Sequence, residues 1–213
     1  MLPLVILRPE PGASATARTA HRLGLAPVVT PLFRLRPLPW QMPKGEFDVL
    51  LLTSATAARL AGDKLRDLVH LPTFAVGAAT AEAAREAGLN VTHVGSGSGR
   101  DSLAEAPGQV LHLSGQDVSA GLDEARVTRV AVYRADLFPE PPPLPRAGVA
   151  LLHSTRAAQA FAPLVDRMGY TVVAISPAVL DAAGGGWATA VAAAEPRDAA
   201  MLGLAAPLCE RAG

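Results

Sequence analysis

The sequence predicts an α/β protein built from two parallel-sheet domains with a cleft between them. Short apolar runs alternate along the chain with Ala-rich segments, an order typical of right-handed βαβ units. Two Pro-rich stretches, 36–43 and 138–146, divide the chain into three pieces, because Pro cannot donate a hydrogen bond inside a sheet. The first piece has about 35 residues, fewer than the roughly 40 that usually fold without a disulfide or a metal.

The N-terminal piece must therefore pack with another part of the chain. We expect residues 1–36 and 147–213 to form one discontinuous domain and residues 37–138 to form the other. The linkers would cover about 34–43 and 134–146, so the chain would cross twice between the domains. We expect the functional site in the cleft, because ligands of parallel sheets bind at the carboxyl ends of the strands.

In the N-terminal half, each expected strand is a short apolar run and each expected helix is rich in Ala. The strands are expected at 5–7, 48–52, 74–76 and 91–94, and the helices at about 14–23, 55–61 and 80–86. The Gly-rich segment 95–99 precedes one further short helix. Its G-x-G-x-G spacing is not that of a dinucleotide-binding loop, so it is either an anion-contacting loop or a turn.

The C-terminal half continues the alternation and repeats part of the first half. Strands are expected at 110–113, 130–132, 149–152 and 172–175, and helices at about 155–168 and near Ala178. Residues 51–58 (LLTSATAA) are similar to 151–158 (LLHSTRAA), and 75–84 (AVGAATAEAA) are similar to 174–183 (AISPAVLDAA). This internal similarity predicts that the two domains have similar folds.

Composition limits the classes of partner and compartment. The chain has 19 basic and 19 acidic residues, and this balance does not favour a nucleic-acid partner. The apolar start stops at Arg8, which predicts a strand rather than a signal peptide, and no apolar run is long enough to span a membrane. The single Cys209 cannot form an internal disulfide, so we expect a reducing, cytoplasmic location.

Small polar residues stand at the ends of the expected strands, where a parallel sheet binds its ligands. They are Thr53, Ser54, Thr80, Ser114, Gly115, Ser154 and Ser176. All except the Ser114–Gly115 turn stand just before an expected helix. Each of those hydroxyls is either an ordinary helix N-cap or part of a set of helix N-termini that together bind several anionic groups.

The sequence contains no motif for a metal, a cofactor or an activated nucleophile. The 5 histidines do not occur at ligand spacing, so we expect neither a metal nor an organic cofactor. Tyr133 stands apart, because it ends the expected strand 130–132 beside Arg134 and the second linker. It is either an amphipathic tyrosine at a domain boundary or a functional residue.

Seven short motifs, taken in their order along the sequence, resemble those of the uroporphyrinogen-III synthase family. The matching pieces are LRP at 7–9, LLTS at 51–54, AVGAATA at 75–81, LHLSG at 111–115, VAVYR at 130–134, LHS at 152–154 and AISP at 174–177. The resemblance spans nearly the whole chain. It implies two α/β domains joined by two strand-like linkers, the first domain being formed by both chain ends.

The resemblance also implies a reaction. Hydroxymethylbilane, a linear tetrapyrrole, loses its hydroxyl as water, its last pyrrole ring is inverted through a spiro intermediate, and the macrocycle closes without a cofactor. Because this substrate ionises and cyclises unaided to the uninverted isomer, the enzyme mainly folds the chain and steers the closure. We therefore expect a monomeric lyase whose partner is this small molecule.

The resemblance implies roles for individual residues of this sequence, taken position by position from the matching motifs. Tyr133 becomes the catalytic candidate that assists departure of the hydroxyl, and Thr80 becomes a threonine of the cleft. The expected binding set for the acetate and propionate groups is Arg8, Thr53, Ser54, Ser114, Gly115, Ser154 and Ser176. Many relatives have Thr or Ser where this chain has Ala178 and Val179, so binding on that side would rely on Ser176 and backbone N–H groups.

Two other classes fit the same architecture. Two hinged α/β domains also describe non-catalytic modules that close on anions, although no export signal appears in the sequence. Nucleotide-sugar transferases have a two-domain design too, but they usually need a longer chain. The isomer of porphyrinogen formed from hydroxymethylbilane would discriminate between these classes.

Overall fold

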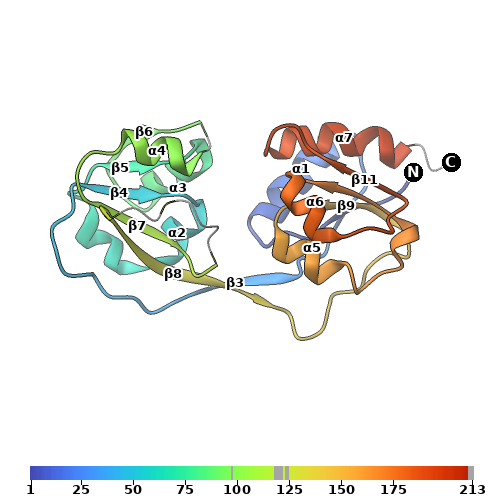
Figure 1. Cartoon of the computed structure of the whole chain (residues 1–213), viewed down its shortest axis with the longest axis horizontal. Helices are drawn as coiled ribbons and strands as arrows, with labels where there is room; N and C mark the ends of the chain where they lie inside the picture. Colours follow the sequence, from blue (N-terminus) through green and yellow to red (C-terminus); the bar gives the residue numbers. More distant parts are fainter. Residues whose placement is uncertain (97, 118–121, 123–124, 211–213) are drawn as a thin grey trace. The chain divides into compact units, whose positions relative to one another are not determined.

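A computed structural model describes residues 1–96, 98–117, 122 and 125–210 of the chain (Figure 1). The chain divides into two compact units. Unit 1 consists of residues 1–34 and 136–213, and unit 2 consists of residues 35–135. Strands from far-apart parts of the sequence therefore meet in unit 1, whereas unit 2 is continuous.

Unit 1 contains a five-stranded sheet in the order β11-β10-β9-β1-β2. Its strands are β1 (Leu4–Ile6), β2 (Pro27–Val29), β9 (Gly148–Leu152), β10 (Tyr170–Ala174) and β11 (Thr189–Ala192). All neighbouring pairs are parallel. Every residue of β1, β9 and β10 is buried, as expected for central strands covered on both faces.

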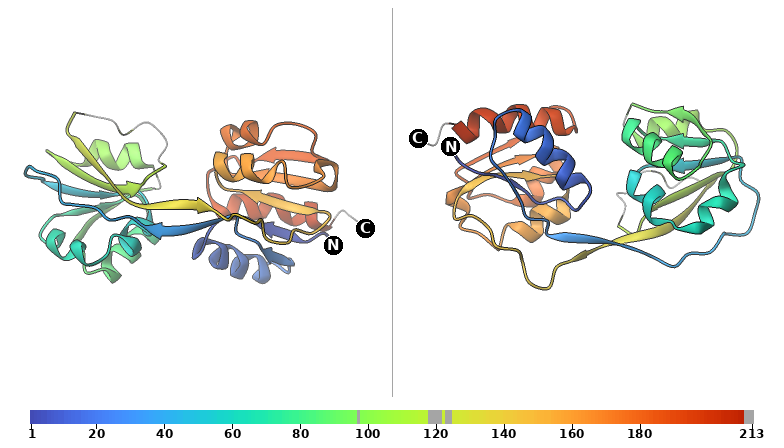
Figure 2. Two further views of the ribbon diagram at one scale, coloured as in Figure 1. Left: turned by 90° about the horizontal axis from the view of Figure 1, so that it is seen from below. Right: turned by 180° about the vertical axis from the view of Figure 1, so that it is seen from behind.

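Two pairs of helices cover the sheet of unit 1, one pair on each face (Figure 2). Helices α1 (Gly12–Arg22) and α7 (Asp198–Glu210) share one apolar core with β1, β9 and β10. Helices α5 (Thr155–Phe161) and α6 (Pro177–Ala183) cover the other face, and a short 3₁₀ helix, η2 (Arg167–Gly169), leads into β10. Near the chain ends, the N–H of Leu2 donates to the carbonyl of Cys209.

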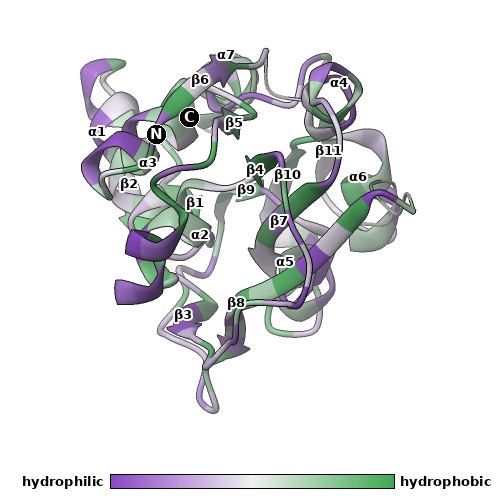
Figure 3. Ribbon diagram, turned by 90° about the vertical axis from the view of Figure 1, so that its left-hand side faces the viewer, coloured by the Kyte–Doolittle hydropathy of each residue, from purple (hydrophilic) through white to green (hydrophobic). Residues whose placement is uncertain are grey.

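Unit 2 is built around a six-stranded sheet in the order β3-β8-β7-β4-β5-β6. Its strands are β3 (Phe33–Pro37), β4 (Val49–Leu52), β5 (Thr73–Ala75), β6 (Val91–Val94), β7 (Val110–Gly115) and β8 (Val127–Leu137). The strands from β8 to β6 are parallel. The buried strand β7 stands out as hydrophobic in Figure 3.

Helices also cover both faces of the sheet in unit 2. Helices α2 (Ala55–Leu60), η1 (Asp63–Leu68, 3₁₀) and α3 (Ala78–Glu86) share an apolar core with β4, β7 and β8. Helix α4 (Gly99–Glu105) packs on the opposite face, where Leu103 and Ala106 contact β4 and β7. Among the described residues, no helix is long and apolar enough to cross a membrane.

The observed strands and helices confirm the α/β class with parallel sheets, but two expected elements have wrong bounds. The helix expected at 155–168 ends at Phe161, because Pro163 lacks the N–H that would continue it. The strand expected at 130–132 runs from Val127 to Leu137, so Tyr133 lies within β8 rather than at its end. The edge strands β2, β3 and β11 and helix α7 were not expected from the sequence.

Candidate functional site

In unit 2, Thr53 at the carboxyl end of β4 forms a polar pair with His112 of the neighbouring strand β7. Thr53 directly follows β4, and His112 lies on β7 opposite Leu51. The Oγ1 of Thr53 is 2.9 Å from the Nε2 of His112, whose side chain is almost fully buried. A half-buried hydroxyl is thus held by an imidazole, which fixes its orientation at the strand end.

Ser54 and Thr80 lie at the starts of two adjacent helices of the same unit. Ser54 is the N-cap of α2, and its hydroxyl accepts a hydrogen bond from the N–H of Thr56 at 3.1 Å. The helix expected to begin at about Thr80 begins two residues earlier, at Ala78, so Thr80 lies in the first turn of α3 and is only 6% exposed. Its N–H donates to the carbonyl of Gly77.

Tyr133 packs against Gly115 where β7 and β8 lose their regular register. The pairing shifts between Ser114 and Gly115, and Gly115 then pairs with Tyr133. A Cβ atom on Gly115 would lie 2.8 Å from Cζ and 3.0 Å from the hydroxyl oxygen of Tyr133, so a larger residue there would require the ring or the strand to move. The N–H of Gln116 also donates to the Tyr133 carbonyl at 2.8 Å.

Ser114 is held from the opposite direction by Arg129 of β8. Its hydroxyl donates to the Gly115 carbonyl at 3.1 Å and accepts from the Nε of Arg129 at 3.0 Å. Ser114 is 1% exposed. The hydroxyl expected to bind a substrate carboxylate is therefore buried and engaged within the protein.

In unit 1, Arg8 belongs to a network centred on Asp198, the first residue of α7. The Nη1 of Arg8 lies 2.8 Å from Oδ1 and 2.9 Å from Oδ2 of Asp198. The Thr16 hydroxyl donates to Oδ2, and the Nε2 of His153 lies 2.9 Å from Oδ1. The side chains of Arg8 and Asp198 are each about one-third exposed, and that of His153 is 8% exposed.

These contacts set the charge of the network. Burial alone would raise the pKa of Asp198, but hydrogen bonds with His153 and Thr16 and the positive charge of Arg8 outweigh it and lower the pKa to about 2. Asp198 is therefore ionised at neutral pH and neutralises Arg8. The Nδ1 of His153 is buried and has no hydrogen-bond partner among the described residues.

Ser154 and Ser176 occupy equivalent places before α5 and α6. The hydroxyl of Ser154 caps α5 by accepting from the N–H of Ala157 at 3.1 Å. Ser176 stands at the N-cap position of α6, but its hydroxyl makes no capping bond, and Pro177 occupies the first turn. Ser154 is exposed and Ser176 is half-buried.

The expected site residues are divided between the two units. Unit 2 holds Thr53, Ser54, Thr80, Ser114, Gly115 and Tyr133, and unit 1 holds Arg8, Ser154 and Ser176. Sequence reasoning missed His112, Arg129, His153 and Asp198. His153 occupies the place of Thr53 in the internal repeat, which was the one available signal.

No group of three or more His, Cys, Asp and Glu side chains suited to a metal occurs in the part of the chain that the structure describes. The one cysteine, Cys209, is buried in the core of unit 1. Burial, with a smaller contribution from Glu210, raises the pKa of its thiol to about 11. Cys209 therefore stays protonated and is not an activated nucleophile.

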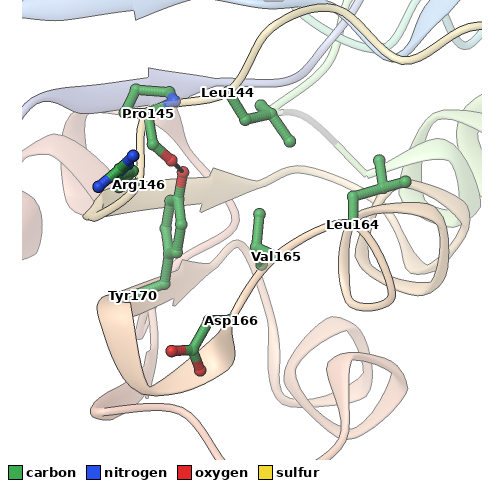
Figure 4. Close-up of a pocket in the computed structure, with 7 residues that line it drawn as sticks. All are labelled: Leu144, Pro145, Arg146, Leu164, Val165, Asp166 and Tyr170. Atoms are coloured by element: carbon green, nitrogen blue, oxygen red, sulfur yellow. Dashed lines mark hydrogen bonds between the residues drawn. The ribbon is translucent and has the colours of Figure 1, made fainter.

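A pocket of about 380 Å³ opens in unit 1, but it lies near the amino-terminal ends of β9 and β10 (Figure 4). The hydroxyl of Tyr170 donates to the carbonyl of Pro145 across this pocket. Its lining residues are Leu144, Pro145, Arg146, Leu164, Val165, Asp166 and Tyr170. None of the expected site residues lines it.

Comparisons with known proteins point to one family. The family model described as uroporphyrinogen-III synthase HemD matches residues 14–203. A uroporphyrinogen-III synthetase structure from Helicobacter pylori is 19% identical, with a TM-score of 0.67 over 98% of this chain and 100% of that one. A mutant uroporphyrinogen III synthase from the extremely thermophilic bacterium Thermus thermophilus is 20% identical, with a TM-score of 0.53 over 99% of this chain and 100% of that one. At this identity the two structures show a shared fold. No curated protein matches the chain.

Proposed function

The chain belongs to the uroporphyrinogen-III synthase family, and we propose that it converts hydroxymethylbilane to uroporphyrinogen III with inversion of the terminal pyrrole ring and loss of water. The observation that carries this proposal is the family match, which extends over residues 14–203 and so includes parts of both units. Membership of a family of tetrapyrrole-forming enzymes does not favour a non-catalytic binding module.

In the proposed mechanism, Tyr133 acts as a proton donor. Its hydroxyl protonates the hydroxyl group of the substrate. The C–O bond then breaks, water leaves, and an azafulvenium cation remains. The inverted ring then forms through a spiro intermediate, and the proton lost from the carbon at which the macrocycle closes restores Tyr133. A neutral phenol can donate a proton to a leaving oxygen, so a tyrosine is chemically suited to this role.

We propose that the substrate carboxylates are bound by many weak contacts from both units. Thr53, Ser54 and Thr80 stand at the strand end and helix starts of unit 2, and Ser154 and Ser176 stand at helix starts of unit 1. The free N–H groups of helix starts favour anions without requiring excess positive charge. This is consistent with the balance of acidic and basic residues in the chain.

At two places, the proposed contacts with the substrate are restricted because the side chains are already engaged within the protein. Ser114 and Gly115 would contribute through their backbone, because the Ser114 hydroxyl is buried and engaged with Arg129. Arg8 would act through the exposed third of its side chain, because its Nη1 is engaged with Asp198. The proposed enzyme is a monomeric lyase that uses no cofactor, because the ionisation of the substrate is intrinsically easy and the protein supplies position.

The test is an isomer assay with the purified full-length chain. Hydroxymethylbilane, made immediately before use, is incubated with and without the protein, and the products are oxidised and separated by chromatography. The proposal predicts the inverted isomer III as the main product with the protein and the uninverted isomer I without it. Formation of isomer I alone, at the uncatalysed rate, would overturn the proposed function.

A further inference from the structure

The carboxyl end of β7 is irregular and needs external support. The register with β8 shifts between Ser114 and Gly115, so the regular ladder of backbone hydrogen bonds is interrupted there before Gly115 pairs with Tyr133. Carbonyl groups released from a ladder must find other donors when they are buried. Gly115 is such a buried residue, and Arg129 of β8 donates to its carbonyl.

Arg129 binds three consecutive residues of this segment. Its Nε donates to the Ser114 hydroxyl at 3.0 Å, and its Nη2 donates to the carbonyls of Gly115 at 3.1 Å and Gln116 at 2.7 Å. Hydrogen bonds from a charged donor are stronger than those between neutral groups. The guanidinium therefore fixes the path of residues 114–116 more firmly than the irregular strand pairing would.

The same three residues support Tyr133. The ring lies directly on the Cα of Gly115, and the Tyr133 carbonyl accepts from the N–H of Gln116. Arg129 precedes Tyr133 by four residues on β8, so both residues hold the end of β7 from the same strand. A shift of residues 114–116 would move the surface on which the phenol rests.

We propose that Arg129 is a positioning residue that holds the Tyr133 hydroxyl in place through the 114–116 segment. The inference rests on the proposed role of Tyr133 in forming uroporphyrinogen III. Arg129 does not donate a proton in the reaction; it keeps the donor aimed at the leaving hydroxyl. Such alignment matters because a misplacement of a catalytic group by about 1 Å can reduce the rate of the reaction roughly 100-fold.

The test is a double-mutant cycle on the full-length enzyme, with kcat and KM measured for isomer III. In the wild-type background, Arg129→Met should lower kcat about tenfold or more and change KM less than about twofold. In the Tyr133→Phe background, the same change should lower kcat less than about threefold, because the phenol it positions is already absent. Arg129→Lys, which keeps a charged donor, should recover part of the lost kcat.

Arg126 provides a matched control in the same unit. Its guanidinium also donates to backbone carbonyls, but these belong to Leu103, Ala106 and Gly108, outside the 114–116 segment. Arg126→Met should lower the melting temperature and should have the same effect on kcat in both backgrounds. If Arg129→Met does not fold, the cycle is completed with Arg129→Lys.

Three results would overturn the inference. Equal losses of kcat in the two backgrounds would show that Arg129 does not act through Tyr133. A rise in KM alone would make Arg129 a substrate contact, and an unchanged kcat would leave it no role in the reaction. A wild-type chain that forms no isomer III would instead refute the proposed function, so the two failures are distinguishable.

Discussion

The Nη1 of Arg8 lies 2.8 Å from the Oδ1 of Asp198, although the two residues are 190 positions apart in the sequence. The contact joins the segment after β1 to the first residue of α7. It therefore ties the two ends of the chain together in unit 1, and its strength depends on the ionisation of Asp198.

We predict that acid weakens unit 1 through Asp198. The contacts of this carboxyl lower its pKa from 3.8 to about 2 in the folded chain, so the unfolded state takes up the proton first as the pH falls. The stabilisation is complete above about pH 4 and is lost as the pH falls toward 2. Its size is at most about 2 kcal/mol, because the pair is one-third exposed and partly screened by solvent. Urea unfolding at several pH values measures it.

The variant Asp198→Asn should remove this pH dependence and lower the free energy of unfolding at pH 7. Glu195→Gln is a suitable control, because Glu195 pairs with Arg197 on the exposed surface, where ion pairs contribute little. An unfolding free energy that falls equally in acid for wild type and Asp198→Asn would contradict the prediction.

We predict that Tyr133→Phe lowers the rate about 100-fold or more, the usual contribution of a positioned proton donor being about 10²–10⁴. The ring and its packing on Gly115 remain, so the melting temperature should change little. The residual product should still be isomer III, because steering depends on the bound shape of the substrate. Steady-state kinetics with isomer separation give both quantities.

Tyr170→Phe is the matched control for Tyr133→Phe. It removes the hydrogen bond to the Pro145 carbonyl, in a pocket that none of the proposed site residues lines, and should change stability without changing the rate. Wild-type turnover by a stable Tyr133→Phe variant would reduce Tyr133 to a packing residue.

We predict that Gly115→Ala lowers both stability and rate. The new methyl group would meet the Tyr133 ring at 2.8 Å, so the ring or the strand must move, at a cost of about 1–3 kcal/mol for overpacking. Gly185→Ala is the control, since a Cβ there has nothing within 4 Å. Thermal unfolding and kcat are measured together; a variant with normal kcat would show that the phenol does not need this support.

We predict that Ser54→Ala and Ser154→Ala mainly raise KM. Each change removes a neutral hydroxyl, which is worth about 0.5–1.5 kcal/mol, and so should raise KM a few-fold. Each also removes an N-cap, so the melting temperature should fall slightly. A thousandfold loss of kcat in either variant would reveal a catalytic role that the present mechanism does not include.

We predict that a fragment of residues 37–138 folds alone and that residues 147–213 do not. Unit 2 is continuous in sequence, whereas the sheet of unit 1 needs β1 between β9 and β2. Without residues 1–34, the apolar face that contacts Leu4 and Ile6 would be exposed. Circular dichroism with thermal melting checks both fragments. A cooperative transition from 147–213 would be inconsistent with this account.

Local patterns made the central strands predictable. The run 49–52 is entirely apolar, and all four of its residues are buried in β4. The edge strand β2 was not predicted because it has only three residues and begins with Pro27. Helix α7 was not predicted because Gly203 and Pro207, which disfavour helices, lie within it. Burial against the sheet, which the local sequence does not reveal, stabilises this helix.

The candidate site was predictable only where a residue's place depends on its own strand or helix. Ser54 and Ser154 were placed correctly, because an N-cap is decided by the next few residues. The pairing of Thr53 with His112, 59 positions away, depends on which strands become neighbours, and that is decided by the whole sheet. The contact of Arg8 with Asp198 has the same origin.

The position of β1 beside β9 also determines the order in which a growing polypeptide can fold. Residues 1–34 leave the ribosome before unit 2, but their partner strand β9 begins at Gly148, after all of unit 2 has been made. Domains generally fold as units during synthesis, so unit 2 can fold while residues 1–34 are still unpaired. Leu4 and Ile6, which are buried in the folded protein, are then exposed to solvent. During translation, β1 therefore stays accessible to chaperones and to aggregation until β9 has been made.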